Sequence, residues 1–410
     1  MKKIFLLLII TTSMLTLHGF SNSTLQSNQF MMKTNSFTAL HKNPANINFA
    51  TESVFSVGLL NWDISAYNNS FSFSDYNKYN GSFLTQEMKD EILDKIDKSL
   101  KLKYDIHVYV VSFHLNQFAY SLSFHNIGEG KFSDGFIDLA LNGNEYNHQY
   151  QFCIDENFGE MTSYLDFELG YNQIIIEKIP QVRIGVGISA LVGINNTKLV
   201  EFETKMIAGD SGLSMSQKIK AKNAIFGFGL KGQIGASSQI LDNLSVGIAV
   251  DNIGGTIDWI ASTKMAEFEI NVDSLFIAEV EDDFMNQTDS LYSIPSYTTS
   301  MPPIFRVGAN YKIYSNWDVS MDAEYSYKES PFTTNGMQVS IGTEYRHWDF
   351  LPVQMSIESK TSEKPFSTVY GFGYLFNNLK YVFAFESIGS VIPGSFAKGI
   401  GISSSIEILF

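Results

Sequence analysis

The chain has 410 residues, and its 28 Lys and Arg against 43 Asp and Glu give a formal net charge of -15. This acidic balance argues against nucleic acid as a partner, and a hydrophobic content of 44% argues against a disordered chain. Charged residues make up 17%, below the roughly 25% of ordinary soluble domains, whereas aromatic residues reach 14%. Such a composition favours a protein with a large apolar outer surface.

A secretory signal is predicted at residues 1–20. Two lysines at positions 2 and 3 precede an apolar run at residues 4–10, and a polar stretch follows at residues 21–24. The apolar run is too short for a spanning helix, and no later stretch offers about eighteen uninterrupted apolar residues. If the mature protein spans a membrane, it must therefore do so as a β-barrel. Cys153 is the only cysteine, so no internal disulfide is expected.

The rest of the chain is expected to form two parts. Residues 21–50 are polar with scattered Phe and Met, and we interpret them as a hatch or plug segment. Residues 51–410 are predicted to form the barrel with its extramembrane loops. Within it, residues 86–100 have the apolar periodicity of a loop helix. Residues 253–303 contain the acidic run 279–283 and are predicted to be a long exposed loop.

Alternation of apolar and polar residues recurs along the whole chain and predicts an all-β protein, an antiparallel barrel of about fourteen transmembrane strands. In one example, Trp317, Met321 and Tyr325 share one face, while acidic residues such as Asp318 and Glu324 share the other. That second face is too charged for a soluble core and suits a lumen. The predicted strands lie near residues 53–61, 63–73, 104–114, 117–125, 165–172, 182–194, 224–236, 244–252, 304–313, 317–328, 337–346, 353–359, 368–377, 380–387 and 400–410.

The last predicted strand carries its alternation to the end of the sequence. Ile400, Ile402, Ile406, Ile408 and Phe410 share one face, with Gly, Ser and Glu residues between them. One face suits lipid and the other suits water, as expected for a strand that closes a barrel. By resemblance to outer-membrane proteins in general, Phe410 is expected to be part of the signal that the barrel-assembly machinery recognises.

Two motifs that suggest enzymes lie in the wrong context. Residues 227–232 match the dinucleotide-binding glycine pattern, but their alternation continues a strand where that motif requires a turn into a helix. Residues 209–212, Gly-Asp-Ser-Gly, are similar to a serine-hydrolase loop, yet no histidine is spaced to act as the base. We therefore expect no enzymatic activity, no catalytic residues and no cofactor.

Three histidines, His107, His114 and His125, fall on neighbouring predicted strands. They could bind a metal ion, but their spacing is not that of a known ligand set. Isolated lumenal histidines are the favoured alternative, so no metal site is predicted.

The motif Asn43-Pro44-Ala45 precedes the first predicted strand. Here the chain resembles the long-chain fatty acid transporter (FadL-like) superfamily of outer-membrane barrels, which carries an Asn-Pro-Ala signature in its amino-terminal segment. The resemblance implies a fourteen-stranded barrel with that segment folded inside as a hatch. It also implies passage of hydrophobic molecules into the barrel and then laterally toward the membrane. Asn43, Pro44 and Ala45 become the candidate hatch or gate residues.

Residues 136–144 look like an uncharacterised Bacteroidetes-type branch of this superfamily, and related barrels of that group serve type IX secretion. Two functions therefore remain open for a protein of the Gram-negative outer membrane. The first is a passive, porin-like channel for small hydrophobic compounds. The alternative is a secretion or surface-attachment barrel that binds protein partners through its loops. The expected partners are outer-membrane lipid, the barrel-assembly machinery, and hydrophobic small molecules or secreted proteins.

We predict that the mature protein lacks residues 1 to about 20 and is recovered in the outer-membrane fraction, because its long apolar run is the signal. Intact-mass measurement of envelope material tests this. A mature chain that still begins at Met1, or a soluble periplasmic product, would contradict the barrel interpretation.

Overall fold

The computed structural model describes residues 30–49, 54–96, 98–210, 212–275, 285–348, 350–359, 364–376 and 378–410. The predicted signal at residues 1–20 and the acidic run at 279–283 lie outside these residues. No helix in the described ranges is long and apolar enough to cross a membrane.

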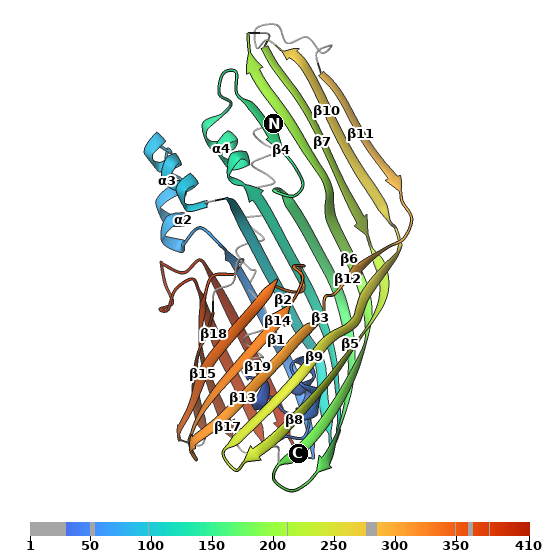
Figure 1. Cartoon of the computed structure of the whole chain (residues 1–410), viewed down its shortest axis with the longest axis vertical. Helices are drawn as coiled ribbons and strands as arrows, with labels where there is room; N and C mark the ends of the chain where they lie inside the picture. The colour runs from blue at the N-terminus through green and yellow to red at the C-terminus, as the bar shows by residue number, and fades with distance from the viewer. Residues whose placement is uncertain are drawn as a thin grey trace.

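Fourteen strands of the described chain form a closed antiparallel barrel (Figure 1), which confirms the predicted fold class. Each strand pairs with the next one around the wall, and the last pairs with the first, where Ile402 lies opposite Ile64. The strands are β1 (Phe55–Asn68), β2 (Ser99–Leu115), β3 (Phe118–Ser133), β5 (Phe158–Ile176), β6 (Gln181–Gly209), β8 (Phe226–Leu241), β9 (Leu244–Ala261), β13 (Ile304–Tyr314), β14 (Trp317–Ser326), β15 (Gly336–Trp348), β16 (Leu351–Glu358), β17 (Ser367–Phe376), β18 (Leu379–Ile388) and β19 (Gly399–Leu409).

Side chains alternate between the two faces of the wall. On β6, Ile184, Val186 and Ile188 are exposed on the outside, whereas Arg183 and Ser189 are buried in the lumen. The same pattern recurs on the other strands, so the outer face is apolar and the inner face is polar. This is the arrangement of a barrel that sits in an outer membrane.

The first two predicted strands are a single strand, β1, so their separation was wrong. Leu59 and Leu60 both point outward, because a β-bulge between Leu59 and Trp62 adds a residue to β1. Leu60 adopts the left-handed conformation, with φ 49°. A bulge reverses the phase of the alternation without ending the strand. The sequence pattern could not distinguish this reversal from a turn.

The two ends of the barrel differ in their connections. Short connections lie at the end that also holds both chain ends of the wall, for example residues 116–117 between β2 and β3 and residues 177–180 between β5 and β6. Long connections lie at the other end. In outer-membrane barrels the short turns face the periplasm and the long loops face outward. The long connections hold α2 (Phe73–Tyr79), α3 (Gln86–Ile96) and α4 (Asp134–Asn142).

The helix predicted at residues 86–100 is confirmed as α3, which buries Ile92 and Ile96. Residues 253–303, predicted as a long exposed loop, are mostly strand, so that prediction was wrong. They complete β9 and then form β10 (Lys264–Leu275), β11 (Met285–Ser293) and β12 (Tyr297–Ser300). Their cross-strand partners lie in β7 and β9, far away in the sequence, so a scan for local alternation did not reveal them.

Beyond the outer rim, the wall continues as a sheet on one side of the barrel (Figure 1). The upper part of β6 pairs with β4 (Gln149–Phe152) and β7 (Gly212–Ala224), β7 pairs with β10, and β10 pairs with β11. We call these five strands the extension. Helix α4 covers part of one face, where Phe136 packs against Phe152 and Phe202.

The N-terminal segment, residues 30–49, lies inside the barrel near its short-turn end. It forms three short 3-10 turns, η1 (Met31–Lys33), η2 (Ser36–His41) and η3 (Pro44–Asn46). These turns contact strands on one half of the wall, from β2 to β13. Met31, Phe37 and Leu40 are fully buried there, so the segment fills this part of the lumen.

Phe410 lies where the barrel closes. Its backbone N–H donates to the Phe55 carbonyl at 2.8 Å, and the two aromatic rings are 5.4 Å apart. We predict that deleting Phe410 slows or abolishes insertion, whereas Phe410→Trp preserves it because an aromatic ring and the backbone contact remain. Heat-modifiable gel migration measures the folded fraction. An unchanged folded fraction after the deletion would exclude a role of Phe410 in assembly.

Candidate functional site

The structure brings Asn43, Pro44 and Ala45 together against the inner wall. The Asn43 side chain accepts a hydrogen bond from the Ala45 N–H at 3.0 Å, and it donates to the carbonyls of Ala236 on β8 and Ile248 on β9 at 3.1 and 3.3 Å. Asn43 is fully buried and extended, with φ -158°, as expected before a proline. Its buried amide is therefore satisfied by two strands of the wall.

Glycines let this motif approach the wall closely. A Cβ atom at Gly185 on β6 would lie 2.2 Å from the Ala45 nitrogen and the Pro44 carbonyl carbon. A Cβ atom at Gly235 on β8 would lie 2.0 Å from Asn43 Oδ1. Asn172 on β5 adds a hydrogen bond of 3.0 Å to the Ala45 carbonyl. A larger side chain would collide with the backbone of the segment at Gly185 and with the Asn43 side chain at Gly235.

The same arrangement continues around the lumen. Further wall glycines face apolar side chains of the N-terminal segment so closely that a Cβ atom would come within 3.0 Å of them. The pairs are Gly58 with Phe37, Gly170 with Leu40, Gly247 with Met32, Gly308 with Met31 and Gly342 with Phe30. We call these five glycines, together with Gly185 and Gly235, the glycine belt. At these positions the segment packs directly against the strands of the wall.

Ion pairs connect the same segment to carboxylates on β14 and β15. Lys33 Nζ lies 2.5 Å from Asp318 and 3.2 Å from Glu344, and Lys42 pairs with Glu324. The Met31 N–H donates to Asp322 at 2.6 Å. The acidic face predicted for β14 therefore contacts the segment.

Above the segment lies a polar cavity of about 190 Å³ that we call the chamber. Aromatic rings from four elements lie beside it: His41 is 4.6 Å from Tyr109, His107 is 3.8 Å from His125, and His125 stacks on Tyr164 at 4.5 Å between centroids. Two buried ion pairs also lie beside the chamber. The side-chain nitrogen of Lys231 is 3.0 Å from an Asp166 carboxylate oxygen, and that of Arg306 is 3.3 Å from an Asp251 carboxylate oxygen.

Of the three histidines on neighbouring predicted strands, His107 and His125 are in contact, and His114 lies apart from them. His114 lies near the short turns, where its Nε2 contacts the Asn116 carbonyl at 2.7 Å. His41, which joins His107, was missed because it comes from the N-terminal segment and only the fold brings it near β2. Among the described residues, no group of three or more His, Cys, Asp or Glu is placed to hold a metal ion.

An apolar layer lies on the extracellular side of the chamber. Ile127, Leu191, Ile257, Trp259 and Met301 form a buried cluster there, drawn from β3, β6, β9 and the segment before β13. Phe332, from the connection between β14 and β15, packs against this cluster. We call this layer the vestibule. The lumen therefore changes from apolar to charged between the outside and the N-terminal segment.

Comparisons with known proteins agree with this architecture. A family described as being of unknown function, DUF5723, matches residues 44–223. No curated protein matches the sequence. A solved structure described as a TodX deltaS2S3 mutant monoaromatic hydrocarbon channel is 13% identical, with a TM-score of 0.54, over 96% of this chain and 100% of that chain.

Two further solved structures are similar. The toluene transporter TbuX from Ralstonia pickettii is 12% identical over 93% of this chain and 97% of its own, with a TM-score of 0.50. The toluene transporter TodX from P. putida is 11% identical over 92% and 94%, also with a TM-score of 0.50. The chain shares the barrel fold of these proteins. At these identities the likeness concerns the fold, and the gate role of residues 43–45 stays a prediction.

We predict that Gly185→Ala loosens the N-terminal segment, because the new methyl group must displace the backbone at Pro44 and Ala45. Overpacking of this kind costs about 1–3 kcal/mol, so tryptic cleavage at Lys33 and Lys42 should accelerate by about 5- to 150-fold if it follows local opening. The matched control is Gly232→Ala on β8, where the nearest atom to the added Cβ is 3.6 Å away. Equal cleavage rates in the two variants would contradict the close packing of the segment at Gly185.

Proposed function

We propose that this outer-membrane barrel is a passive channel for small hydrophobic compounds, with the N-terminal segment as its hatch. The observation that supports this most is the segment at residues 30–49, which packs closely against the inner wall at the short-turn end of the barrel. An open pore for hydrophilic solutes would not need such a hatch. The similar folds of proteins described as toluene transporters and as a monoaromatic hydrocarbon channel support the same substrate class.

The vestibule is the proposed entry point. Its buried apolar side chains offer a hydrophobic compound an environment that water does not, at roughly 25 cal/mol for each Å² of apolar surface removed from water. Direct passage further inward would place the compound among the buried ion pairs of Lys231 and Arg306. Separating such pairs without water costs several kcal/mol per ion. The lumen layers therefore favour a route that leaves the barrel sideways, as the family resemblance implies.

Beside the vestibule, two facing glycines leave the wall without side chains at one point, and we propose that the exit lies there. The pairing of β6 with β8 ends at Gly193 and Gly227, and the Trp259 indole packs against both glycines from inside. On the outer side, Ile225 and Phe228 are exposed. At this point two glycines of the wall, which have no side chains, lie between the Trp259 and Ile257 side chains of the vestibule and the outer surface. We infer that a small hydrophobic compound leaves the barrel here.

Removing residues 24–42 tests the hatch. We predict that ionic conductance in planar bilayers rises, because the deletion removes most of the segment from the lumen while the wall keeps its inter-strand hydrogen bonds. Wild-type protein should be nearly closed to ions, yet it should pass a hydrophobic dye more readily than a charged dye of similar size. Pro44→Gly should give a milder, flickering conductance, since it frees the backbone at the anchor and leaves the segment attached.

A matched set of lumenal lysines controls for charge. Lys33→Ala combined with Lys42→Ala removes the cations that hold the segment and should also raise conductance. Lys380→Ala removes a lumenal lysine that pairs with Glu407, within the wall, and should leave conductance unchanged. If the deletion variant conducts no better than wild type, the segment is not a hatch, and the secretion or attachment alternative becomes the better one.

A further inference from the structure

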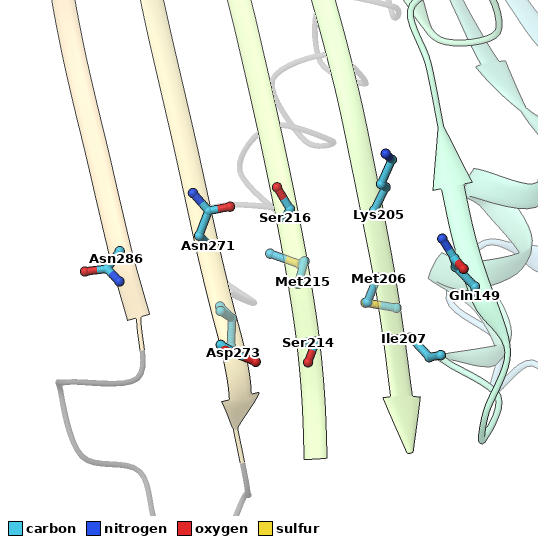
Figure 2. Close-up of a pocket in the computed structure, with 11 residues that line it drawn as sticks. Gln149, Lys205, Met206, Ile207, Ser214, Met215, Ser216, Asn271, Asp273 and Asn286 are labelled. Carbon is cyan, nitrogen blue, oxygen red and sulfur yellow. The ribbon is translucent and has the colours of Figure 1, made fainter. Parts of the chain in front are cut away.

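The extension has a free edge outside the membrane. Figure 2 shows its strands side by side, with Gln149 on β4, Lys205 on β6, Ser216 on β7, Asn271 on β10 and Asn286 on β11, around a cavity of about 700 Å³. Within the described chain, β11 pairs with β10 alone. The backbone groups on the other side of β11 therefore have no strand beside them.

The edge strand lacks the usual protection against pairing. Natural edge strands are shortened, bulged, or carry lysine or proline that blocks another strand. β11 is nine residues long, pairs without a bulge, and has neither lysine nor proline. Asp289 is its one charged residue, and its side chains from Asn286 to Ser293 are exposed or half-exposed. Such an edge is suited to receiving a further strand.

Charged rows run across the extension and end beside this edge. On one face, Glu201, Lys220 and Glu267 stand opposite one another on β6, β7 and β10, and Lys220 Nζ lies 3.1 and 3.2 Å from the two carboxylates. Hydrogen bonds to Glu201 and Glu267 raise the pKa of Lys220, so this lysine stays charged at neutral pH. A second row follows the same order, with Glu203, Lys218 and Glu269.

Each row therefore ends with a glutamate on β10, next to a small residue on β11. Ser290 stands opposite Glu267, and Thr288 stands opposite Glu269. A strand added to β11 would place alternate side chains in line with these rows. Lysine or arginine at those positions could reach across Ser290 and Thr288 to the carboxylates. Glutamate or aspartate there would be repelled.

A second copy of this chain does not fit the edge. Two barrels in one membrane are related by rotation about the membrane normal, and β11 runs more along the long axis of the molecule than across it (Figure 1). Antiparallel pairing of two such strands would invert one barrel. Parallel pairing about that axis would place each Asp289 beside its own copy, where the like charges repel. The occupant must therefore be a different chain.

We propose that β11 binds an extended segment of another polypeptide outside the cell, with lysine or arginine at alternate positions, as an added strand of the extension. Backbone hydrogen bonds hold the segment, and Glu267 and Glu269 select its basic side chains. This binding site is independent of the lumen, so it requires neither an open nor a closed hatch.

Synthetic nine-residue peptides test the proposal with the full-length folded protein in detergent. A labelled peptide of alternating Lys and Thr should bind, as measured by fluorescence anisotropy, and the matching Glu and Thr peptide should not. A version of the Lys peptide with N-methyl groups on alternate amides keeps the charge and loses the strand pairing. It should not bind. Equal binding of the methylated peptide would overturn strand addition and leave only nonspecific charge attraction.

Substitutions on the protein locate the site. Glu267→Gln combined with Glu269→Gln should weaken binding of the Lys peptide by about 2- to 25-fold, on the basis of 0.2–1 kcal/mol for each cross-strand charge pair. Glu203→Gln is the control. It neutralises the glutamate on β6, at the end of the Glu269 row that lies away from β11. Equal losses in the two variants would show that the edge is not the site. A wild-type dimer that Thr288→Lys dissociates would overturn the choice of a different chain as occupant.

Discussion

Close contact between the backbone of the N-terminal segment and a glycine-lined wall is the constraint on which the lumen depends. At Gly185 and Gly235 the wall has no side chains, and Asn43, Pro44 and Ala45 lie directly on the strands. Hydrogen bonds from Asn43 to two wall carbonyls then hold the motif in place. Because Gly185 faces the backbone of Pro44 and Ala45, and the Asn43 side chain bonds to wall carbonyls, a small change on either side alters how the segment packs.

Ion pairs add a second kind of contact. Lys33 and Lys42 pair with carboxylates of β14 and β15, while other residues of the segment pack against wall glycines. This division explains how a lumen can be filled without a continuous apolar core. It also leaves a charged layer that a hydrocarbon would avoid. This layer is the reason for proposing a lateral exit at the wall glycines beside Trp259.

Much of this architecture could be predicted from the sequence, because a barrel wall is a local pattern. Period-two alternation identified the faces of the strands, and the helix at residues 86–100 followed from its own periodicity. The bulge at Leu60 and strands β7, β10 and β11 of the extension were missed. A phase reversal resembles a turn, and the partners of β10 lie in distant β7. The glycine belt was also invisible, because its meaning depends on which residues of the segment face each glycine.

The most direct test of the account is whether residues 30–49 are shielded inside the folded barrel. Ala39→Cys, in a Cys153→Ser background, places a thiol at a position that is 0% exposed. Its reaction with a small water-soluble thiol reagent should be at least about 100-fold slower than that of Ser82→Cys on an outer loop, as expected for a local opening free energy of about 3 kcal/mol. Equal reaction rates at the two positions would contradict the account, because they would place the segment in solvent.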